Sequence, residues 1–342
     1  MSKSSFALMA ALGAGGGAAA TAALFSLRSD PLKNMPVPVP GPVTVSPSTI
    51  VSPGSSHGSA VMTPPGGFGS ATPAGNPAGG GHSPVNPAGI FEYGFPGRVS
   101  DVALRSALAS GYDRERRNPS WVTEHITRES LAQRNGDRKR STFVEDTSIP
   151  EKFRALLRDY YRSGFDRGHQ VPAADCKWAQ SAMDETFFLS NMSPQVGDGF
   201  NRDYWAHFED FCRRLTHRYP SVHIVTGPLY LPKREADGKW YVKYEMIGNP
   251  PNVAVPTHFY KVIFAEDGRE GGNVAIGAFV LPNAIIPNNK PLREFEVPLE
   301  AVERASGLEF AEKLSIQRRR RLCTETDCSL VIREFAQQQK KQ

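Results

Sequence analysis

The clearest helical pattern in this 342-residue chain lies at residues 201–218. Apolar and aromatic side chains recur there at positions 204, 205, 208, 211, 212 and 215. This spacing places them on one face of an α-helix, so we predict that Trp205 and Phe208 belong to the core. A shorter pattern of the same kind predicts a second helix at residues 150–161.

Other apolar runs are rich in β-branched and aromatic residues, which is typical of strands. The predicted strands lie at residues 118–127, 187–191, 222–228, 240–244, 258–264 and 274–280. They follow one another with few helices between them, rather than alternating strictly with helices. This order predicts an α+β fold with a largely antiparallel central sheet.

Composition divides the chain into parts. Residues 35–89 are rich in Pro, Gly and Ser, and they contain almost no charge and few large apolar side chains. Such a segment cannot bury enough apolar surface to offset the entropy of ordering, so we predict a disordered tether. We place the folded domain at residues 90–335, which is long enough for one substantial core, and a polar tail at 336–342.

Residues 6–27 form an uncharged stretch rich in Ala, Gly and Leu. Its 22 residues (6 through 27) are enough to cross a bilayer, although the many small side chains make it only marginally hydrophobic. We therefore predict that residues 1–34 are a targeting or membrane-anchor segment. A secretory signal, a mitochondrial targeting segment and a retained anchor all fit this pattern.

Net charge says little about partners. The chain carries +5, of which residues 1–89 contribute +2 (three Lys/Arg minus one Asp), leaving +3 for the rest. Three local clusters of basic residues are more informative, although each is typical of a solvated face. They are Arg114/Arg116/Arg117, Arg134/Arg138/Lys139/Arg140 and Arg318 to Arg321.

The four cysteines do not have the spacing of a zinc site, because none forms a Cys-x-x-Cys pair. Buried free thiols are the default expectation. A disulfide between Cys323 and Cys328 is the alternative in an oxidising compartment.

The candidate chemistry centres on the tetrad Asp166-Arg167-Gly168-His169. An imidazole takes a proton near neutral pH, and a guanidinium holds a phosphate oxygen in a planar fork. The glycine between them has no Cβ to keep an anionic backbone away. We interpret the Asp166 carboxylate as structural, a local acceptor that orients the turn.

The helix after residue 200 adds two polar groups. Asn201 and Glu209 lie eight residues apart, which on one helix separates them by roughly 80° and lets both face one edge of a site. The alternative for Asn201 is an ordinary N-cap. The other histidines, at positions 125, 207, 217, 223 and 258, lie in no such motif and are interpreted as structural.

Together these motifs resemble the signature of the DNA/RNA non-specific endonucleases, which are ββα-metal (His-Me finger) nucleases. The sequence around these motifs is most similar to the mitochondrial endonuclease G branch, particularly its fungal members. The resemblance is carried in order by residues 112–127, 137–138, 166–169, 189–195, 201–209, 226–230 and 255–261. It covers most of residues 90–310.

The resemblance implies a role for each matched residue. The general base falls on His169 and the magnesium-ligating asparagine on Asn201. The helix glutamate of the family falls on Glu209, and its motif arginine on Arg167. An upstream arginine that contacts the scissile phosphate falls on Arg138.

Arg140 is the competing choice for that upstream arginine. The family also implies a sheet flanked by helices, a homodimer, and cleavage of DNA and RNA with Mg²⁺, Mn²⁺ also supporting activity. We expect a mitochondrial location at the inner membrane or intermembrane space, with N-terminal association with that membrane. Relocation to the nucleus belongs to the same expectation.

These residue types suit hydrolysis of a phosphodiester. A neutral His169 can take a proton from the attacking water, with its tautomer held by a backbone carbonyl or by Asn191. A single Mg²⁺ keeps most of its water shell, so one Asn201 ligand is adequate, with Glu209 accepting hydrogen bonds from the bound water. The alternative is a catalytically silent, membrane-tethered nucleic-acid-binding protein with the same fold. The intact set of His169, Asn201 and Glu209 argues against it.

Overall fold

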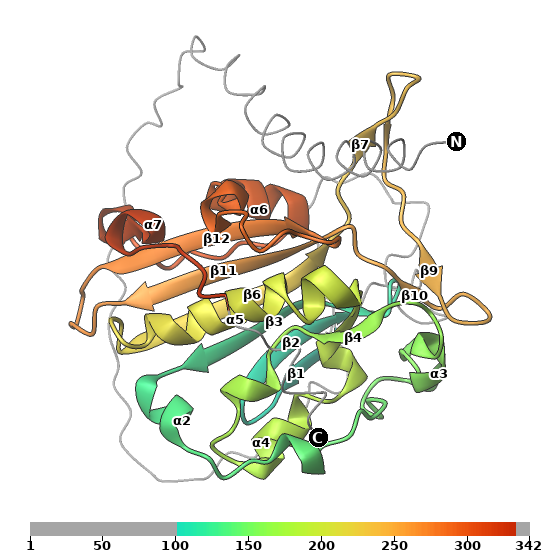
Figure 1. Ribbon diagram of the computed structural model, residues 1–342, viewed down its shortest axis with the longest axis horizontal. Coiled ribbons are helices and arrows are strands. Elements are labelled where there is room, and N and C mark those ends of the chain that lie inside the picture. The colour runs from blue at the N-terminus through green and yellow to red at the C-terminus, as the bar shows by residue number, and fades with distance from the viewer. Residues whose placement is uncertain (1–100, 333–342) are drawn as a thin grey trace, which may run out of the picture. The chain divides into compact units, whose positions relative to one another are not determined.

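The computed structural model describes residues 101–332 (Figure 1). The predictions for the anchor segment 1–34, the tether 35–89 and the tail 336–342 lie outside this range. Within residues 101–332, no helix has the length and apolar character needed to cross a membrane.

A seven-stranded sheet organises the domain, in the order β1-β2-β3-β6-β11-β12-β13. All neighbours in it are antiparallel except β12 and β13, which are parallel. Its strands are β1 (Asp101–Leu104), β2 (Leu108–Asp113), β3 (Asn118–Ile126), β6 (Ser221–Leu229), β11 (His258–Glu266), β12 (Val274–Pro282) and β13 (Arg319–Arg321). The predicted α+β architecture with a largely antiparallel sheet is confirmed.

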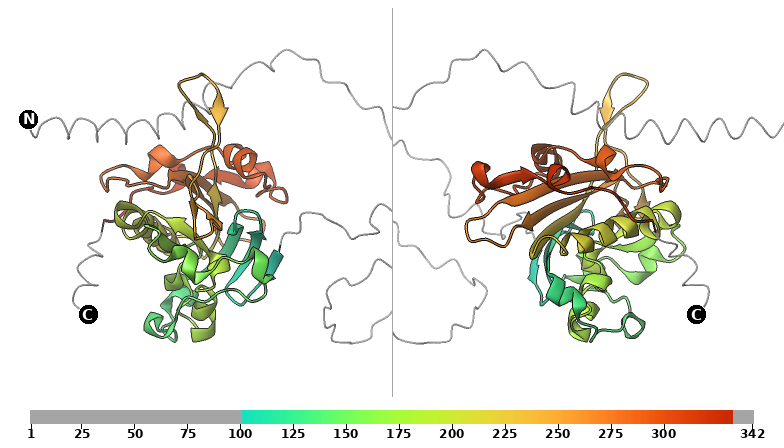
Figure 2. Two further views of the ribbon diagram at one scale, coloured as in Figure 1. Left: turned by 90° about the vertical axis from the view of Figure 1, so that its right-hand side faces the viewer. Right: turned by 60° about the vertical axis from the view of Figure 1, so that its left-hand side comes forward.

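Three two-stranded ribbons and six short helices surround this sheet in the described range. The ribbons pair β4 (Asp166–His169) with β5 (Met192–Gln195), β7 (Lys233–Arg234) with β8 (Trp240–Tyr241), and β9 (Met246–Ile247) with β10 (Val253–Ala254). The helices are α2 (Arg128–Ala132), α3 (Leu157–Tyr160), α4 (Gln180–Glu185), α5 (Tyr204–Leu215), α6 (Leu299–Ser306) and α7 (Leu322–Glu325). The β7–β8 hairpin projects from the body of the domain (Figure 2).

The two faces of the sheet bury different cores because successive side chains of a strand point to opposite faces. On β11, Phe259 and Ile263 pack with the apolar stripe of α5, whereas Tyr260 and Val262 pack with Val302 of α6. α5 and α6 thus cover opposite faces (Figure 2). The long strands near 118–127, 222–228, 258–264 and 274–280 are confirmed.

The helix predicted at residues 150–161 is wrong. The segment instead contains a 3-10 turn at Glu151–Phe153 and the single turn of α3. Between them the buried Ala155 donates its backbone N–H to the Tyr112 hydroxyl at 3.1 Å. A hydrogen bond to another part of the fold therefore replaces the bond that a continuous helix would make.

Two predicted strands also differ. Residues 187–191 contain a 3-10 turn at Leu189–Asn191, and the strand β5 begins only at Met192. The run 240–244 pairs only over the two residues of β8. Short apolar runs carry no signal that separates a strand from a buried turn, which accounts for the first error.

The α5 helix begins at Tyr204, three residues later than predicted. Asn201 ends an irregular turn, Gly197–Asn201, in which Gly199 takes the left-handed φ of +77°. The residue that precedes the helix is Asp203, so the interpretation of Asn201 as an N-cap is wrong. The 80° relation between Asn201 and Glu209 is wrong for the same reason, since the two do not share a helix.

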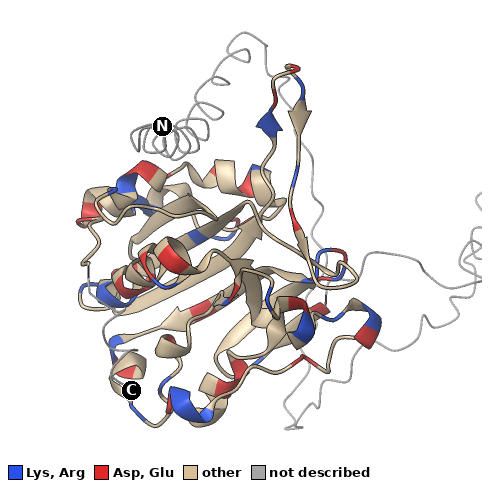
Figure 3. Ribbon diagram, turned by 45° about the vertical axis from the view of Figure 1, so that its right-hand side comes forward, with Lys and Arg blue, Asp and Glu red and all other residues tan. Residues whose placement is uncertain are grey.

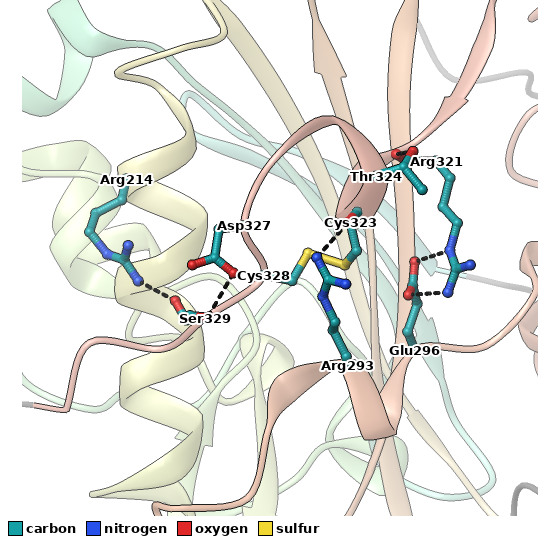
Figure 4. Close-up of a disulfide and its surroundings, with 9 residues drawn as sticks. All are labelled: Arg214, Arg293, Glu296, Arg321, Cys323, Thr324, Asp327, Cys328 and Ser329. Atoms are coloured by element: carbon teal, nitrogen blue, oxygen red, sulfur yellow. Dashed lines mark hydrogen bonds and ion pairs between the residues drawn. A yellow bond between two sulfur atoms is a disulfide. The ribbon is translucent and has the colours of Figure 1, made fainter.

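The expectation that the cysteines are buried free thiols is confirmed for two of them and is wrong for the other two. Cys176 and Cys212 are buried free thiols, whereas Cys323 and Cys328 form a disulfide (Figure 4). Arg293 donates to the Cys323 carbonyl at 2.7 Å beside this bond (Figure 4).

Candidate functional site

The candidate site is built on β4, β5 and the start of α5. The tetrad is the whole of β4, and in the antiparallel register Gly168 lies opposite Ser193 and His169 opposite Met192. The polypeptide then turns through Gly197–Asn201 into α5. Two short strands followed by a helix thus bring the tetrad and Asn201 together, 32 residues apart in sequence (201 − 169).

Gly168 has a different role from the one predicted. A Cβ built on it would lie 2.0 Å from Gln195 Oε1 and 2.4 Å from Gln195 Cγ. Gln195 is fully buried, so it has little room to move aside. The glycine is therefore required by packing between β4 and β5, and the interpretation that it gives an anionic backbone access is wrong.

His169 lies in an aromatic and cationic surrounding. Its ring packs edge-on against Phe187, with the centroids 4.9 Å apart, and is tilted against Phe143 at 5.6 Å. Burial, followed by the positive charge of Arg138, lowers the pKa of His169 to about 3. The imidazole is therefore neutral at neutral pH, and its buried Nε2 has no hydrogen-bond partner among the described residues.

Asn191 does not orient this imidazole. Its side-chain amide donates to the backbone carbonyls of Val171 and Thr186, at 3.0 and 2.8 Å, and its Oδ1 accepts from the Val171 N–H. These bonds use the amide to shape the turn after β4. Of the two predicted partners of His169, Asn191 is therefore wrong, and within residues 101–332 no backbone carbonyl accepts from the ring either.

Asp166 holds Asn201 in place. Asn201 Nδ2 donates to Asp166 Oδ2 at 2.8 Å, and the same carboxylate accepts from Arg202 Nε and Nη2, at 2.8 and 2.5 Å. The bond uses the amide nitrogen of Asn201. Its oxygen has no hydrogen-bond donor among the described residues and remains able to bind a cation.

Two arginines reach the site over aromatic rings. The Arg167 guanidinium lies 4.2 Å from the centroid of Phe143, and that of Arg138 lies 5.2 Å from the centroid of Phe187. These are the two rings that pack against His169. Cation–π contact holds a guanidinium in place without neutralising it, so both charges stay available to an anion.

The three basic clusters differ in how they are used. Arg318 and Arg319 donate to backbone carbonyls, which indicates a structural role. Arg321 pairs with the Glu296 carboxylate (Figure 4). Arg114 pairs with Asp101 in the same way. In Figure 3 basic and acidic segments are interspersed along the ribbon.

The cluster Arg134/Arg138/Lys139/Arg140 differs from the other two, because one of its members faces the site. Arg138 lines a cavity of about 870 Å³ together with Arg167 and Asn201. Arg140 is exposed and does not line it. The geometry therefore favours Arg138 over Arg140 as the arginine near His169.

Glu209 projects from α5 into a set of charged groups. Burial raises its pKa to about 7, while Lys261 and Arg213 act in the opposite direction and Asp175 adds to the rise. Arg213 Nη1 bonds to Asp175 Oδ1 at 2.8 Å. Arg138 also acts on Glu209, which places this carboxyl close to the arginine of the cavity.

The sequence analysis missed the buried charged residues near Glu209. Lys261 is 1% exposed and lies in a predicted strand, where it bonds to Thr226 Oγ1 at 2.8 Å and sits 4.9 Å from the Trp205 ring centroid. Glu124 is also buried in a predicted strand, and burial raises its pKa well above the ordinary value. A charged residue at an inward position of a strand is the only sequence signal of such a network.

Residues 101–332 contain no cluster of three His, Cys, Asp or Glu side chains arranged to hold a metal ion. The donor set instead offers the Asn201 amide oxygen, with Glu209 on the neighbouring helix. Oxygen donors that are few and mostly neutral suit a hydrated Mg²⁺ or Mn²⁺ better than zinc, which takes nitrogen and sulfur ligands. The residues therefore fit a hydrated divalent cation.

The fold and site define a hydrolase of the ββα type, with a neutral histidine on a strand and an asparagine ahead of the helix. The family model described as DNA/RNA non-specific endonuclease matches residues 86–317. The chain belongs to this family, in a branch with fungal mitochondrial nucleases and endonuclease G, and is a nuclease.

Three similar proteins illustrate the relation. The "Mitochondrial nuclease" of Saccharomyces cerevisiae is 58% identical over 258 residues, covering 74% of this chain and 78% of that protein. Human "Endonuclease G, mitochondrial" is 44% identical, covering 66% of this chain and 74% of its own length. A solved structure described as the EndoG/EndoGI complex superimposes with a TM-score of 0.63 at 45% identity, covering 70% of this chain and 100% of that one.

Proposed function

We propose that this nuclease is a metal-dependent endonuclease that hydrolyses the phosphodiester bonds of both DNA and RNA, with His169 as general base. The observation that carries the proposal is a neutral imidazole whose buried Nε2 is unpartnered among the described residues, and whose two packing rings, Phe143 and Phe187, also hold the guanidiniums of Arg167 and Arg138. Asn201 lines the same cavity as both arginines. A base, cationic groups and an oxygen ligand are what this hydrolysis requires.

The chemical step begins with a water molecule. His169 Nε2 takes its proton as the water oxygen attacks phosphorus, and the 3′-oxygen leaves, so that the products carry 5′-phosphates. Burial and Arg138 keep the ring unprotonated before substrate binds. An incoming phosphate brings negative charge next to Arg138, which offsets that guanidinium and makes His169 a stronger base in the complex.

Arg138 and Arg167 bind the phosphoryl oxygens. Both guanidiniums are held over aromatic rings, and neither forms an ion pair or hydrogen bond with a carboxylate among the described residues. A planar guanidinium makes two parallel bonds to a phosphate, which stabilises the charge that grows as water attacks.

Asn201 would hold the metal through its amide oxygen, because Asp166 occupies the amide nitrogen. A divalent cation bound there supplies charge stabilisation for the phosphoryl and leaving oxygens. Glu209, once ionised, accepts hydrogen bonds from water around Asn201 and acts outside the direct ligand set.

The proposal also covers the substrate range of the enzyme and its location in the cell. Contacts to phosphates carry no base or sugar information, which supports action on DNA and RNA without strong sequence preference. The names of the Saccharomyces cerevisiae and human relatives support a mitochondrial location. Membrane association at the inner membrane, relocation to the nucleus and a homodimer are parts of the proposal that rest on the family resemblance.

Degradation of supercoiled plasmid and of a structured RNA by the purified full chain tests this proposal. Cleavage of both substrates with Mg²⁺ or Mn²⁺, abolished by chelator, is the expected result. Binding of both nucleic acids without any cleavage, across titrations of both metals, would instead support the catalytically silent alternative.

A further inference from the structure

The arginines of the described residues fall into two groups. Most form an ion pair or donate to a carbonyl, as Arg114 does to Asp101 and Arg213 to Asp175. Four arginines whose guanidiniums make no ion pair or hydrogen bond to a described residue line the site cavity: Arg138, Arg158, Arg162 and Arg167.

Two of these four arginines, Arg158 and Arg162, have no role in the proposed chemical step. Arg158 belongs to α3 and Arg162 to the turn that leads from α3 into β4. Both side chains are exposed, and both line the same cavity as Asn201 and Arg167. The one carboxylate of the lining, Asp166, is already paired with Arg202. The four unpaired guanidiniums therefore repel one another, and an anion in the hollow relieves this repulsion.

The backbone at Arg162 is held in an unfavourable conformation. Its φ is +55°, in the left-handed region that costs a residue with a side chain on the order of 1 kcal/mol. The preceding Tyr161 is 70% exposed, and the Arg162 guanidinium lies 5.1 Å from its ring centroid. The turn therefore fixes a guanidinium at the rim of the cavity, although a glycine would fit this backbone better.

We propose that Arg158 and Arg162 form a second phosphate subsite, which binds the backbone of the substrate strand next to the phosphate that is cut. Tyr161 is the positioning residue that holds the Arg162 guanidinium. This inference rests on the proposed nuclease function and adds two contacts that act on binding and on substrate length. It gives the enzyme a preference for a polynucleotide over a single phosphodiester.

The test compares two substrates of different length on the full chain with Mg²⁺. Bis(4-nitrophenyl) phosphate has one phosphate and occupies only the scissile position, whereas a 16-nucleotide duplex also reaches the subsite. The variants are Arg158→Ala, Arg162→Gly and their combination. Arg304→Ala is the matched control, because Arg304 is exposed on α6, has no partner among the described residues, and does not line the cavity.

Glycine is chosen at position 162 because it adopts positive φ without cost. Arg162→Gly should therefore have a Tm at or above that of the unsubstituted chain, which excludes misfolding as the cause of any loss. The double variant should raise KM for the duplex by tenfold or more, with kcat and the small-substrate rate changed less than twofold. Arg304→Ala should leave both substrates unaffected.

Salt dependence of duplex binding, measured by fluorescence anisotropy in chelator, gives a readout that needs no turnover. Each lost phosphate contact reduces the slope of log K against log salt by about 0.9, so the double variant should lose about 1.8. An unchanged slope with an unchanged duplex KM would overturn the subsite while leaving the nuclease function intact. Equal losses on both substrates would also overturn it, and no cleavage of either substrate by the unsubstituted chain would refute the proposed function instead.

Discussion

Asn201 Nδ2 donates a 2.8 Å hydrogen bond to Asp166 Oδ2, so the first residue of β4 fixes the orientation of the asparagine that precedes α5. The bond joins the two parts of the ββα unit. It also decides which atom of the amide is left for a cation, because the nitrogen is used and the oxygen is not.

Asp166→Ala should therefore weaken metal binding rather than the chemical step. Without its acceptor the Asn201 amide is free to rotate, and loss of such an orienting partner typically costs about 10–100-fold in metal affinity. The concentration of Mg²⁺ needed for half-maximal plasmid cleavage should rise by that factor. The rate at saturating Mg²⁺ should recover most of its original value.

Asp198→Ala is the matched control for this change. Asp166 and Asp198 both pair with Arg202, at 2.5 and 3.0 Å, but only Asp166 bonds to Asn201. Equal Mg²⁺ requirements in the two variants would refute the orienting role of Asp166.

Arg138→Ala should raise the pKa of His169. The Arg138 charge is the second cause of the low pKa, after burial, so its removal moves the value upward but leaves it below the ordinary 6.5. NMR titration of the His169 ring measures this shift directly. Cleavage should fall by roughly 10²–10³-fold, as expected when one donor to the transition state is lost.

Arg140→Ala serves as the comparison, because it removes the same charge from the same segment outside the cavity. Neither the pKa of His169 nor the cleavage rate should change by a measurable amount. If Arg140→Ala produced the larger loss of cleavage, the assignment of the phosphate contact to Arg138 would be wrong.

Glu209→Gln should stabilise the fold above neutral pH while reducing activity. Burial raises the pKa of Glu209 from 4.5 to about 7, so between these values the folded chain holds a proton that the unfolded chain has released. The free energy of unfolding therefore falls as pH rises through this window, and it stays lower above pH 7. At pH 8 the variant should be more stable by on the order of 2–3 kcal/mol.

Denaturant midpoints at pH 4 and pH 8 test this prediction. The advantage of Glu209→Gln should vanish at pH 4, where both states are protonated, and cleavage should be reduced about 10–100-fold at saturating metal. Glu312→Gln, at an exposed position, should change neither quantity. If Glu209→Gln were less stable than the unsubstituted chain at pH 8, the ionised carboxylate would stabilise the fold and the prediction would be wrong.

Long periodic segments could be predicted from the sequence because their pattern matches a single period over many residues. The strands β3, β6, β11 and β12 are examples, as is most of α5. The segment 150–161 failed although its apolar spacing is helical, since the Ala155 amide bonds to Tyr112 of another strand. No local pattern reports a partner that is 43 residues away.

The site was predictable only in part. The positions of His169 and Asn201 came from a resemblance carried by several motifs in order, not from spacing. The bond between Asp166 and Asn201 and the packing of Gly168 against Gln195 depend on how β4 pairs with β5. Side-chain roles of this kind are set by register, which a single sequence does not specify.

In the proposed mechanism, His169 removes a proton from the attacking water. The most direct test of this step is the single-turnover rate of plasmid cleavage by the full-length His169→Ala variant at saturating Mg²⁺, with DNA affinity measured in parallel. Loss of a positioned base should lower this rate by about 10²–10⁴-fold while the affinity for DNA stays within twofold. Cleavage by His169→Ala at the rate of the unsubstituted chain would contradict the role of His169 as general base.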